Sequence, residues 1–303
     1  MRIGIDLGGT KTEAVALGNR GQILERRRRP SPQGDYQATL ETIRDLVVGL
    51  ERDLKRRGTV GVGIPGAISP ASGMVKNANS TWLIGQPLTE DISEVLERPV
   101  RIENDANCFA LSEASDGAGA DAQCVFGVIL GTGVGGGLVI EGKVLVGINA
   151  IAGEWGHTPL PWPLDEERPG PTCYCGRQGC LETFLSGPGL ARDHLAISGE
   201  PLAPAELVAR AAASDSAAEA TLVRYEGRLA RALACVINLV DPDVVVLGGG
   251  LSNMARLYDR VPGLLPPYVF SDQVATRIVP PMYGDSSGVR GAAWLWPPEA
   301  VPP

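Results

Sequence analysis

The chain has 303 residues, of which 44% are hydrophobic, so it can bury a substantial core and is long enough for two domains. A net charge of -8 and a pI near 5.0 argue against a protein that coats nucleic acid, because such proteins are basic. The sequence shows neither a signal-peptide pattern nor an apolar stretch long enough for a bilayer. We therefore predict a cytoplasmic protein with no nucleic-acid or membrane partner.

The N-terminal part reads as strands and helices in alternation. Two apolar strands flank a glycine turn at Gly8–Gly9, and residues 36–57 carry apolar side chains at helical spacing. "TVGVGIPGAIS" (59–69) predicts a buried strand, and "RPVRIENDANCFALSEA" (98–114) predicts a strand, a polar turn and a helix. The arginine run 26–29 could bind phosphate, but a solvated edge strand explains it equally simply, and we favour that interpretation.

The second half repeats the pattern of the first. "CVFGVILGTGVGGGLVIEGKVLVG" (124–147) again predicts strand, glycine turn and strand, so two related units are expected to face one another across a cleft. Residues 151–188 are rich in Gly, Pro, Cys and Trp and indicate a loop held by something other than a core. A helical region over 204–238 and a buried strand ending at Gly248–Gly250 follow, and a short apolar helix ends the chain.

Three glycine turns at strand ends are candidates for phosphate binding. They are "DLGGTK" (6–11), "GTGVGGG" (131–137) and "GGG" (248–250). Glycine lets backbone N–H groups approach a bound anion closely, and none of the three has the spacing of a P-loop. Such turns also occur in ordinary hairpins, so the combination of three carries more weight than any one of them.

The stretch "PTCYCGRQGCLETF" (171–184) places three cysteines within eight residues. Together with His157, sixteen residues before the first of them, Cys173, Cys175 and Cys180 make the Cys₃His set that structural zinc prefers. A redox Cys-x-Cys pair is the alternative, but it accounts for neither the third cysteine nor the histidine. Because four protein ligands leave no open position, we predict a structural Zn²⁺. The other histidine, His194, has no partner motif and is expected at the surface or at a helix end.

The motifs "IDLGGTK", "GIPG", "ENDAN", "GTGVGGG", "GEWGH" and "CYCGRQGCLE", in this order along nearly the whole chain, resemble the ROK family of sugar kinases, repressors and open reading frames. The resemblance implies an α/β, actin-like ATPase (ribonuclease H-like) fold with two lobes around a central cleft. The lobes are expected over 1–115, with a C-terminal helix 288–303 packed back onto it, and over 116–287, which contains the zinc loop 151–188. The implied reaction is ATP-dependent phosphorylation of a hexose, with Mg²⁺.

The resemblance also assigns roles to residues. Asp105 matches the family's catalytic base, which takes the proton of the attacking sugar hydroxyl, although from the residues alone a helix N-cap explains it equally well. The expected sugar ligands are Gly66, Asn79, Asn104, Asp105, Glu154, His157 and Glu182. The expected ATP-binding residues are Asp6, Gly8, Gly9, Thr10, Lys11, Gly131, Thr132, Gly133, Gly248 and Gly249, with Asp6 orienting Mg²⁺ through water.

The identity of the sugar rests on two segments. "KNANSTWL" (76–83) and "GDSSGVRGAAWLW" (284–296) are most similar to the bacterial fructokinases of the family, which also accept mannose, so fructose is the expected substrate. Glucose and N-acetylated hexosamines are the alternatives within the family. A sugar-responsive repressor is less favoured, because its DNA-binding segment would precede the first glycine turn and Asp6 lies almost at the first methionine. A non-catalytic sugar-binding protein is the third possibility. The resemblance suggests a homodimer.

Overall fold

The computed structural model describes residues 1–297, and for Asp285 the backbone alone. The strands are β1 (Arg2–Leu7), β2 (Lys11–Leu17), β3 (Ile23–Pro30), β4 (Thr59–Ile64), β5 (Ala67–Ile68), β6 (Val75–Lys76), β7 (Val100–Asn104), β8 (Cys124–Leu130), β9 (Val134–Ile140), β10 (Lys143–Val144), β11 (Val244–Gly248) and β12 (Arg277–Val279). The helices are α1 (Tyr36–Leu54), α2 (Leu88–Val95), α3 (Asp105–Asp116), α4 (Leu181–Leu185), α5 (Gly187–Ser198), α6 (Pro204–Ala212), α7 (Ser216–Val240), α8 (Arg256–Leu264) and α9 (Ser287–Trp294). Among the described residues, no helix has both the length and the apolar character to cross a membrane.

The chain divides into two compact units. Unit 1 contains Met1–Asp121, Gly137–Ala152 and the segment from Met282 onward, and unit 2 contains Ala122–Gly136 and Gly153–Pro281. The two lobes expected from the sequence, over 1–115 and 116–287, remain a prediction. The helix expected over 288–303 corresponds to α9, and the part of that range beyond residue 297 lies outside the described residues.

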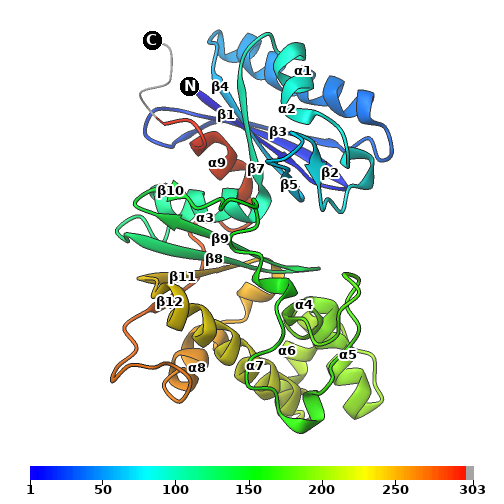
Figure 1. Cartoon of the computed structure of the whole chain (residues 1–303), viewed down its shortest axis with the longest axis vertical. Coiled ribbons are helices and arrows are strands. Elements are labelled where there is room, and N and C mark those ends of the chain that lie inside the picture. The colour runs from blue at the N-terminus through cyan, green and yellow to red at the C-terminus, as the bar shows by residue number, and fades with distance from the viewer. Residues whose placement is uncertain (298–303) are drawn as a thin grey trace. The chain divides into compact units, whose positions relative to one another are not determined.

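The main sheet of unit 1 has helices on both faces (Figure 1). Its strand order is β3-β2-β1-β4-β7, in which β2 is antiparallel to β1 while β1, β4 and β7 are parallel. Helices α1 and α2 bury apolar side chains such as Ile43 and Leu46 in the core with the strands. On α9's side, a Cβ on Gly61 would lie 1.9 Å from the carbonyl oxygen of Ala292. Glycine in the strand therefore lets α9 lie directly on the sheet.

The arginine run is the edge strand β3, as we favoured. Arg26 and Arg28 pair with the buried carboxylate of Glu13 at 2.5 and 2.6 Å, and Arg27 pairs with Glu25 at 2.6 Å. Charged side chains on an edge strand also oppose pairing with another chain. These arginines thus serve the strand on which they lie.

The second sheet repeats the order of the first. Its strands are arranged β10-β9-β8-β11-β12, so each sheet has the order third, second, first, fourth, fifth. Strands β8, β11 and β12 are parallel, as β1, β4 and β7 are. This repeat confirms the similarity between halves that the glycine-rich strand patterns predicted. In unit 2 the 25-residue helix α7 packs against α4, α5, α6 and α8.

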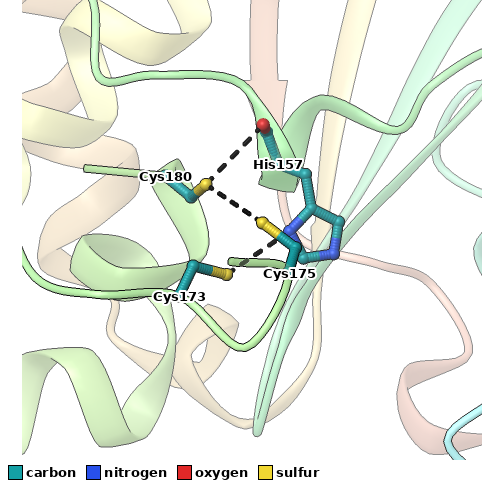
Figure 2. A group of neighbouring side chains, drawn as sticks. All are labelled: His157, Cys173, Cys175 and Cys180. Atoms are coloured by element: carbon teal, nitrogen blue, oxygen red, sulfur yellow. Dashed lines mark hydrogen bonds between the residues drawn. The ribbon is translucent and has the colours of Figure 1, made fainter. Parts of the chain in front are cut away.

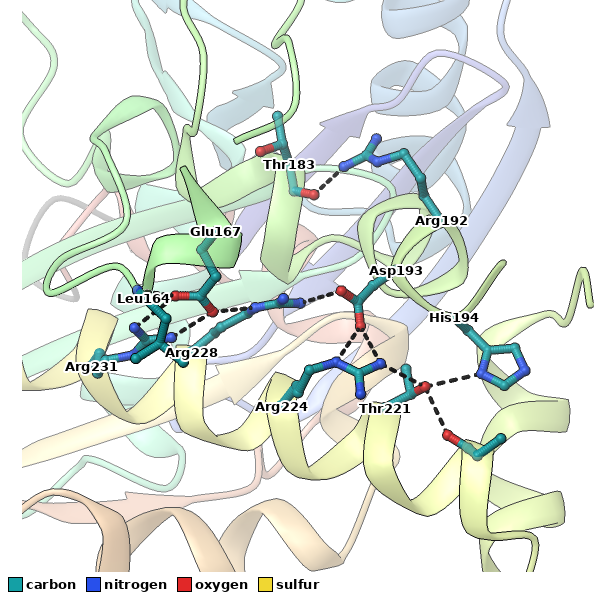
Figure 3. A network of polar contacts seen from close by, with 11 residues as sticks. Leu164, Glu167, Thr183, Arg192, Asp193, His194, Thr221, Arg224, Arg228 and Arg231 are labelled. Atoms are coloured by element: carbon teal, nitrogen blue, oxygen red, sulfur yellow. Dashed lines mark hydrogen bonds and ion pairs between the residues drawn. The ribbon is translucent and has the colours of Figure 1, made fainter. Parts of the chain in front are cut away.

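A buried ion-pair network ties the region after His157 to α7 (Figure 3). Glu167, only 6% exposed, accepts hydrogen bonds from Arg228 and Arg231 at 2.8 Å. Asp193 of α5 continues the network through a 2.8 Å contact with Arg228. The region 151–188 is therefore anchored by buried ion pairs in addition to the proposed metal ligands.

His194 lies at the other end of the same network, and its predicted surface position is wrong. The side chain is 1% exposed, and its Nδ1 lies 3.0 Å from the Thr221 hydroxyl on α7 (Figure 3). This burial could not be predicted from the sequence, because the contact depends on how α5 packs against α7.

Candidate functional site

In unit 1, predicted site residues meet at the carboxyl ends of three parallel strands. Asp6 is near the end of β1, Gly66 follows β4, and Asn104 ends β7. The register places Asp6 beside Gly63, and Ile64 beside Asn104. Parallel α/β sheets bind ligands at this edge, because neighbouring strands deliver their following turns to the same place.

Asn104 and Asp105 have different local roles. The Asn104 side chain is the N-cap of α3: its oxygen accepts from Ala106 N at 2.9 Å, and its Nδ2 donates to Gly66 O at 2.9 Å. Asp105 is the first residue of α3 and accepts from the same Ala106 N–H at 2.7 Å. The capping role that the sequence left open for Asp105 therefore falls to Asn104, and Asp105 places a carboxylate at a helix N-terminus, which stabilises negative charge.

Asp6 lies in the field of other carboxylates. Burial and, to a smaller extent, the negative charges of Asp105 and Glu13 raise the pKa of Asp6 from 3.8 to about 7. The positive charges of Lys11 and Arg28 partly offset this rise. A site where negative groups repel one another is one that a cation relieves. The residues present thus fit Mg²⁺ brought in with ATP, held by Asp6.

The first glycine turn is tight and open to solvent. Gly8 N donates to Lys11 O at 3.0 Å, while Gly9, Thr10 and Lys11 are exposed. Asn79, after β6, is exposed as well. These residues are accessible to a ligand.

Unit 2 contains a cavity of about 820 Å³ at the ends of β8 and β11. Its lining residues are Gly131, Thr132, Gly187, Pro188, Ala191, Ala203, Pro204, Ala205, Val208, Gly250, Leu251, Asn253 and Met254. Two of the predicted ATP residues, Gly131 and Thr132, are among them, whereas at the β11 end Gly250 lines the cavity and Gly248 and Gly249 do not. A space of this size, mostly apolar with glycine backbone at one end, suits a nucleotide base and its phosphates.

The cavity's apolar side was missed by sequence reasoning. It comes from the starts of α5 and α6 and from residues 250–254. The sequence contained only residues typical of helix starts, a Gly-Pro-Gly at 187–189 and a Pro at 204. These residues do not indicate that the two helix starts line the same cavity.

Glu182 and Glu154 are both held near the second glycine turn. Glu182, in the first turn of α4, accepts from Val134 N at 3.2 Å, and a Cβ on Gly133 would lie 2.9 Å from the same carboxylate oxygen. Glycine at 133 therefore leaves room for the carboxylate. Glu154 is exposed, and the next residue, Trp155, is buried and donates to Gly135 O at 2.9 Å. The Glu182 carboxylate is thus held at the start of β9, and Trp155 fixes the backbone next to Glu154.

The predicted metal ligands converge (Figure 2). The ligand atoms of His157, Cys173, Cys175 and Cys180 all lie within 4.8 Å of one another. Cys175 and Cys180 Sγ are 3.7 Å apart, and Cys173 Sγ is 3.6 Å from His157 Nδ1. Tetrahedral zinc bonds require S–S and S–N separations of about 3.8 and about 3.6 Å. The donor set and these two separations are therefore compatible with a tetrahedral Zn²⁺ site.

Tyr174, between the first two cysteines, is a further polar group here that the sequence did not single out. Its hydroxyl lies 2.9 Å from His157 Nε2, and the two rings meet edge to face at 5.1 Å. Burial, then the charges of Glu182, Cys173 and Glu154, raise the pKa of Tyr174 to about 12. The charges of the two carboxylates predicted to bind sugar thus act on Tyr174.

Comparison with known proteins identifies relatives along nearly the whole length. The model of the ROK family matches residues 2–299. An N-acetyl-D-glucosamine kinase of Yersinia pseudotuberculosis is 40% identical over 299 residues, which are 97% of this chain and 98% of that protein. Among solved structures, a ROK hexokinase from Thermus thermophilus has a TM-score of 0.85 at 31% identity and covers 97% of this chain and 96% of its own. A ROK glucokinase from Streptomyces griseus, in complex with glucose and AMPPNP, has a TM-score of 0.76 at 26% identity, covering 97% and 98%.

Proposed function

This chain belongs to the ROK family, and on that premise we propose that it is an ATP-dependent sugar kinase that phosphorylates N-acetyl-D-glucosamine at the 6-hydroxyl. Its fold is the α/β, actin-like ATPase fold that the motifs implied. The choice of sugar is carried by the 40% identity, over 97% of the chain, to kinases named for that substrate. Those relatives favour the N-acetylhexosamine alternative over fructose.

The two segments behind the fructose expectation serve mainly to hold unit 1 together. In 284–296, Arg290 is 2% exposed and pairs with Asp116, and a Cβ on Gly291 would clash with Cys108 O. In 76–83, Leu83 is fully buried and Trp82 donates to Thr39. Asn79, also in 76–83, is exposed and is a proposed sugar ligand. The buried residues of the two segments are fixed by packing and carry little information about a sugar, so their resemblance to fructokinases is a weak guide to substrate.

In the proposed reaction Asp105 is the general base. A sugar hydroxyl attacks the γ-phosphorus effectively only when an acceptor holds it in line and takes its proton. Asp105 offers a carboxylate fixed at the start of α3 and close enough to Asp6 for their charges to interact. Asn104, Gly66 and Asn79 are the other sugar ligands proposed from unit 1. When bound with ATP, Mg²⁺ supplies neutralisation of the phosphate charge, and Asp6 would hold it through water.

Unit 2 is proposed to bind the nucleotide and further sugar hydroxyls. The cavity lined by Gly131, Thr132 and Gly250 accepts the base and ribose, and the phosphates lie near the glycine backbone. Gly133, Gly248 and Gly249, and in unit 1 Gly8, Gly9, Thr10 and Lys11, remain proposed phosphate contacts. Glu154 and Glu182 accept hydrogen bonds from sugar hydroxyls. Four protein ligands complete the Zn²⁺ site, so its role is structural: to hold the segment that carries these two glutamates.

The substrate is tested by measuring ADP release with N-acetylglucosamine, glucose, mannose and fructose at equal concentrations. We expect the highest kcat/KM with N-acetylglucosamine, and ³¹P NMR should identify the product as the 6-phosphate. Higher kcat/KM with fructose and mannose would restore the fructokinase assignment. Sugar binding without sugar-dependent ADP release from any of the four would instead show a non-catalytic sugar-binding protein.

A further inference from the structure

His157 engages both of its ring nitrogens within unit 2. Nδ1 faces Cys173 Sγ at 3.6 Å, and Nε2 lies on the side away from the sulfurs (Figure 2). Nε2 is 2.9 Å from the Tyr174 hydroxyl. The sugar contact that family resemblance assigned to His157 would have to use Nε2, since Nδ1 belongs to the metal set. Nε2 already has the Tyr174 hydroxyl as its hydrogen-bond partner, so a ligand that approaches from this side meets the Tyr174 hydroxyl first.

The direction of this hydrogen bond follows from the metal site. When Nδ1 of a neutral imidazole binds zinc, the ring proton is on Nε2, so Nε2–H donates and the tyrosine oxygen accepts. A phenol has one proton of its own, which is then left to donate to another acceptor. Tyr174 is 74% exposed, so a ligand can reach it. His157 thus fixes the tyrosine oxygen and leaves its O–H as a donor.

The neighbouring carboxylates cannot provide such a donor. Glu154 and Glu182 lie near enough for their charges to act on Tyr174, and ionised carboxylates only accept hydrogen bonds. They suit sugar hydroxyls, which bring their own protons. An N-acetylated hexosamine differs from the parent hexose by an acetamido group, whose carbonyl oxygen has no proton and requires a donor. In this part of the site the Tyr174 O–H is the group that meets that requirement.

We propose that Tyr174 is a specificity-determining residue: its hydroxyl, held by the metal ligand His157, donates a hydrogen bond to the acetamido carbonyl of the substrate. The inference rests on the proposed N-acetylglucosamine kinase function and deepens it. A site built to pair with a substrate polar group discriminates against a substrate without it, since the group is then left unpaired. Glucose, with a hydroxyl in place of the acetamido group, should depend on Tyr174 much less.

The test is Tyr174→Phe, which removes the hydroxyl and keeps the ring against His157. We expect kcat/KM for N-acetylglucosamine to fall about tenfold, the value of one hydrogen bond, and its Kd by titration calorimetry to rise to match. With glucose the same quantities should change less than about twofold. Zinc content by mass spectrometry should equal that of wild type. Tyr268→Phe, on a tyrosine of unit 2 that packs against Trp162, is the matched control and should change neither sugar.

Each other outcome overturns the proposal in a distinct way. Equal losses with both sugars would mean that Tyr174 acts only by positioning His157, and a loss of zinc would place that effect at the metal site. Unchanged kcat/KM and Kd for N-acetylglucosamine would mean that the hydroxyl does not contact it. If wild type turns over glucose and not N-acetylglucosamine, the proposed substrate is wrong, and the tyrosine assignment fails with it.

Discussion

The two five-stranded sheets share a strand order but present opposite chemistry at the ends of their parallel strands. In unit 1 these ends carry the carboxylates Asp6 and Asp105, which repel one another enough to contribute to the raised pKa of Asp6. In unit 2 the ends of β8 and β11 carry Gly131, Thr132 and Gly250 around a mostly apolar cavity. The difference teaches that one topology delivers turns to one edge of the sheet, and that the residues in those turns decide whether the edge carries carboxylates or a glycine-lined apolar cavity.

The largest effect is expected from removing the proposed general base, Asp105, in unit 1. Asp105→Asn keeps the size of the side chain but cannot take the proton of the sugar hydroxyl, so kcat should fall about 10²- to 10⁴-fold while the sugar Kd changes little. Steady-state kinetics and calorimetry measure the two quantities. Asp45→Asn, on the exposed face of α1, is the control. Turnover like that of wild type would remove Asp105 from the role of base.

The next effect concerns the zinc loop of unit 2. Cys175→Ser removes one thiolate at an exposed position, so zinc content should fall and KM for the sugar should rise about ten- to hundredfold, because Glu154 and Glu182 lose their support. We expect circular dichroism to show a retained fold, since Trp155 and Glu167 still anchor the segment. Cys235→Ser is the control. Unchanged sugar affinity in demonstrably zinc-free protein would contradict the structural role.

Adding a side chain in the apolar cavity of unit 2 should change KM for ATP and not KM for the sugar. A side chain on Gly250 meets open space in the cavity, so Gly250→Val should raise KM for ATP about tenfold and leave KM for the sugar unchanged. Its neighbour Gly249 has φ of 81°, and a Cβ there would lie 2.4 Å from Leu130 O, so Gly249→Ala should lower stability instead. Gly263→Val, on α8 away from the cavity, is the control for an added side chain. ATP kinetics unaffected by Gly250→Val would place the nucleotide elsewhere.

The smallest effects are on stability, and they have opposite signs in the two units. The pKa of Asp6 is raised from 3.8 to about 7, so in Mg²⁺-free, nucleotide-free protein the folded state holds a proton that the unfolded state has lost. This contribution makes stability fall as pH rises from about 4 to about 7, and Asp6→Asn should remove the fall, by on the order of 3 kcal/mol at pH 8. Urea unfolding at pH 5 and pH 8 measures it. An Asp6→Asn protein with the same pH dependence as wild type would contradict the raised pKa.

For Glu167 in unit 2 we expect the opposite dependence of stability on pH. Burial alone would raise its pKa, but hydrogen bonds from Arg231 and Arg228 prevail and lower it from 4.5 to about 2. Its contribution is therefore complete above about pH 4.5 and is lost as the pH falls toward 2. Glu167→Gln should flatten the acid limb of the stability profile measured by urea unfolding, and an unchanged acid limb would mean that the ion pairs do not stabilise the fold.

The sequence by itself determined the local chemistry of this protein. Glycine turns after apolar strands, the Cys₃His set and the Asn104-Asp105 pair before a helix were each visible, because strand period, turn chemistry and ligand type are short-range properties. The repeated strand order followed from the repeated pattern. The fold class and an ATP-dependent sugar kinase were predicted from the resemblance of these motifs to the ROK family.

Only the tertiary structure decided which residues meet. Three features depend on backbone angles and on packing between distant segments. Asn104 caps α3 while Asp105 begins it, two helix starts line the cavity, and the Tyr174 hydroxyl lies against Nε2 of His157. The burial of His194 has the same origin. A side chain's neighbours are set by the three-dimensional path of the chain, so a sequence names the groups that do the chemistry but leaves their partners to the fold.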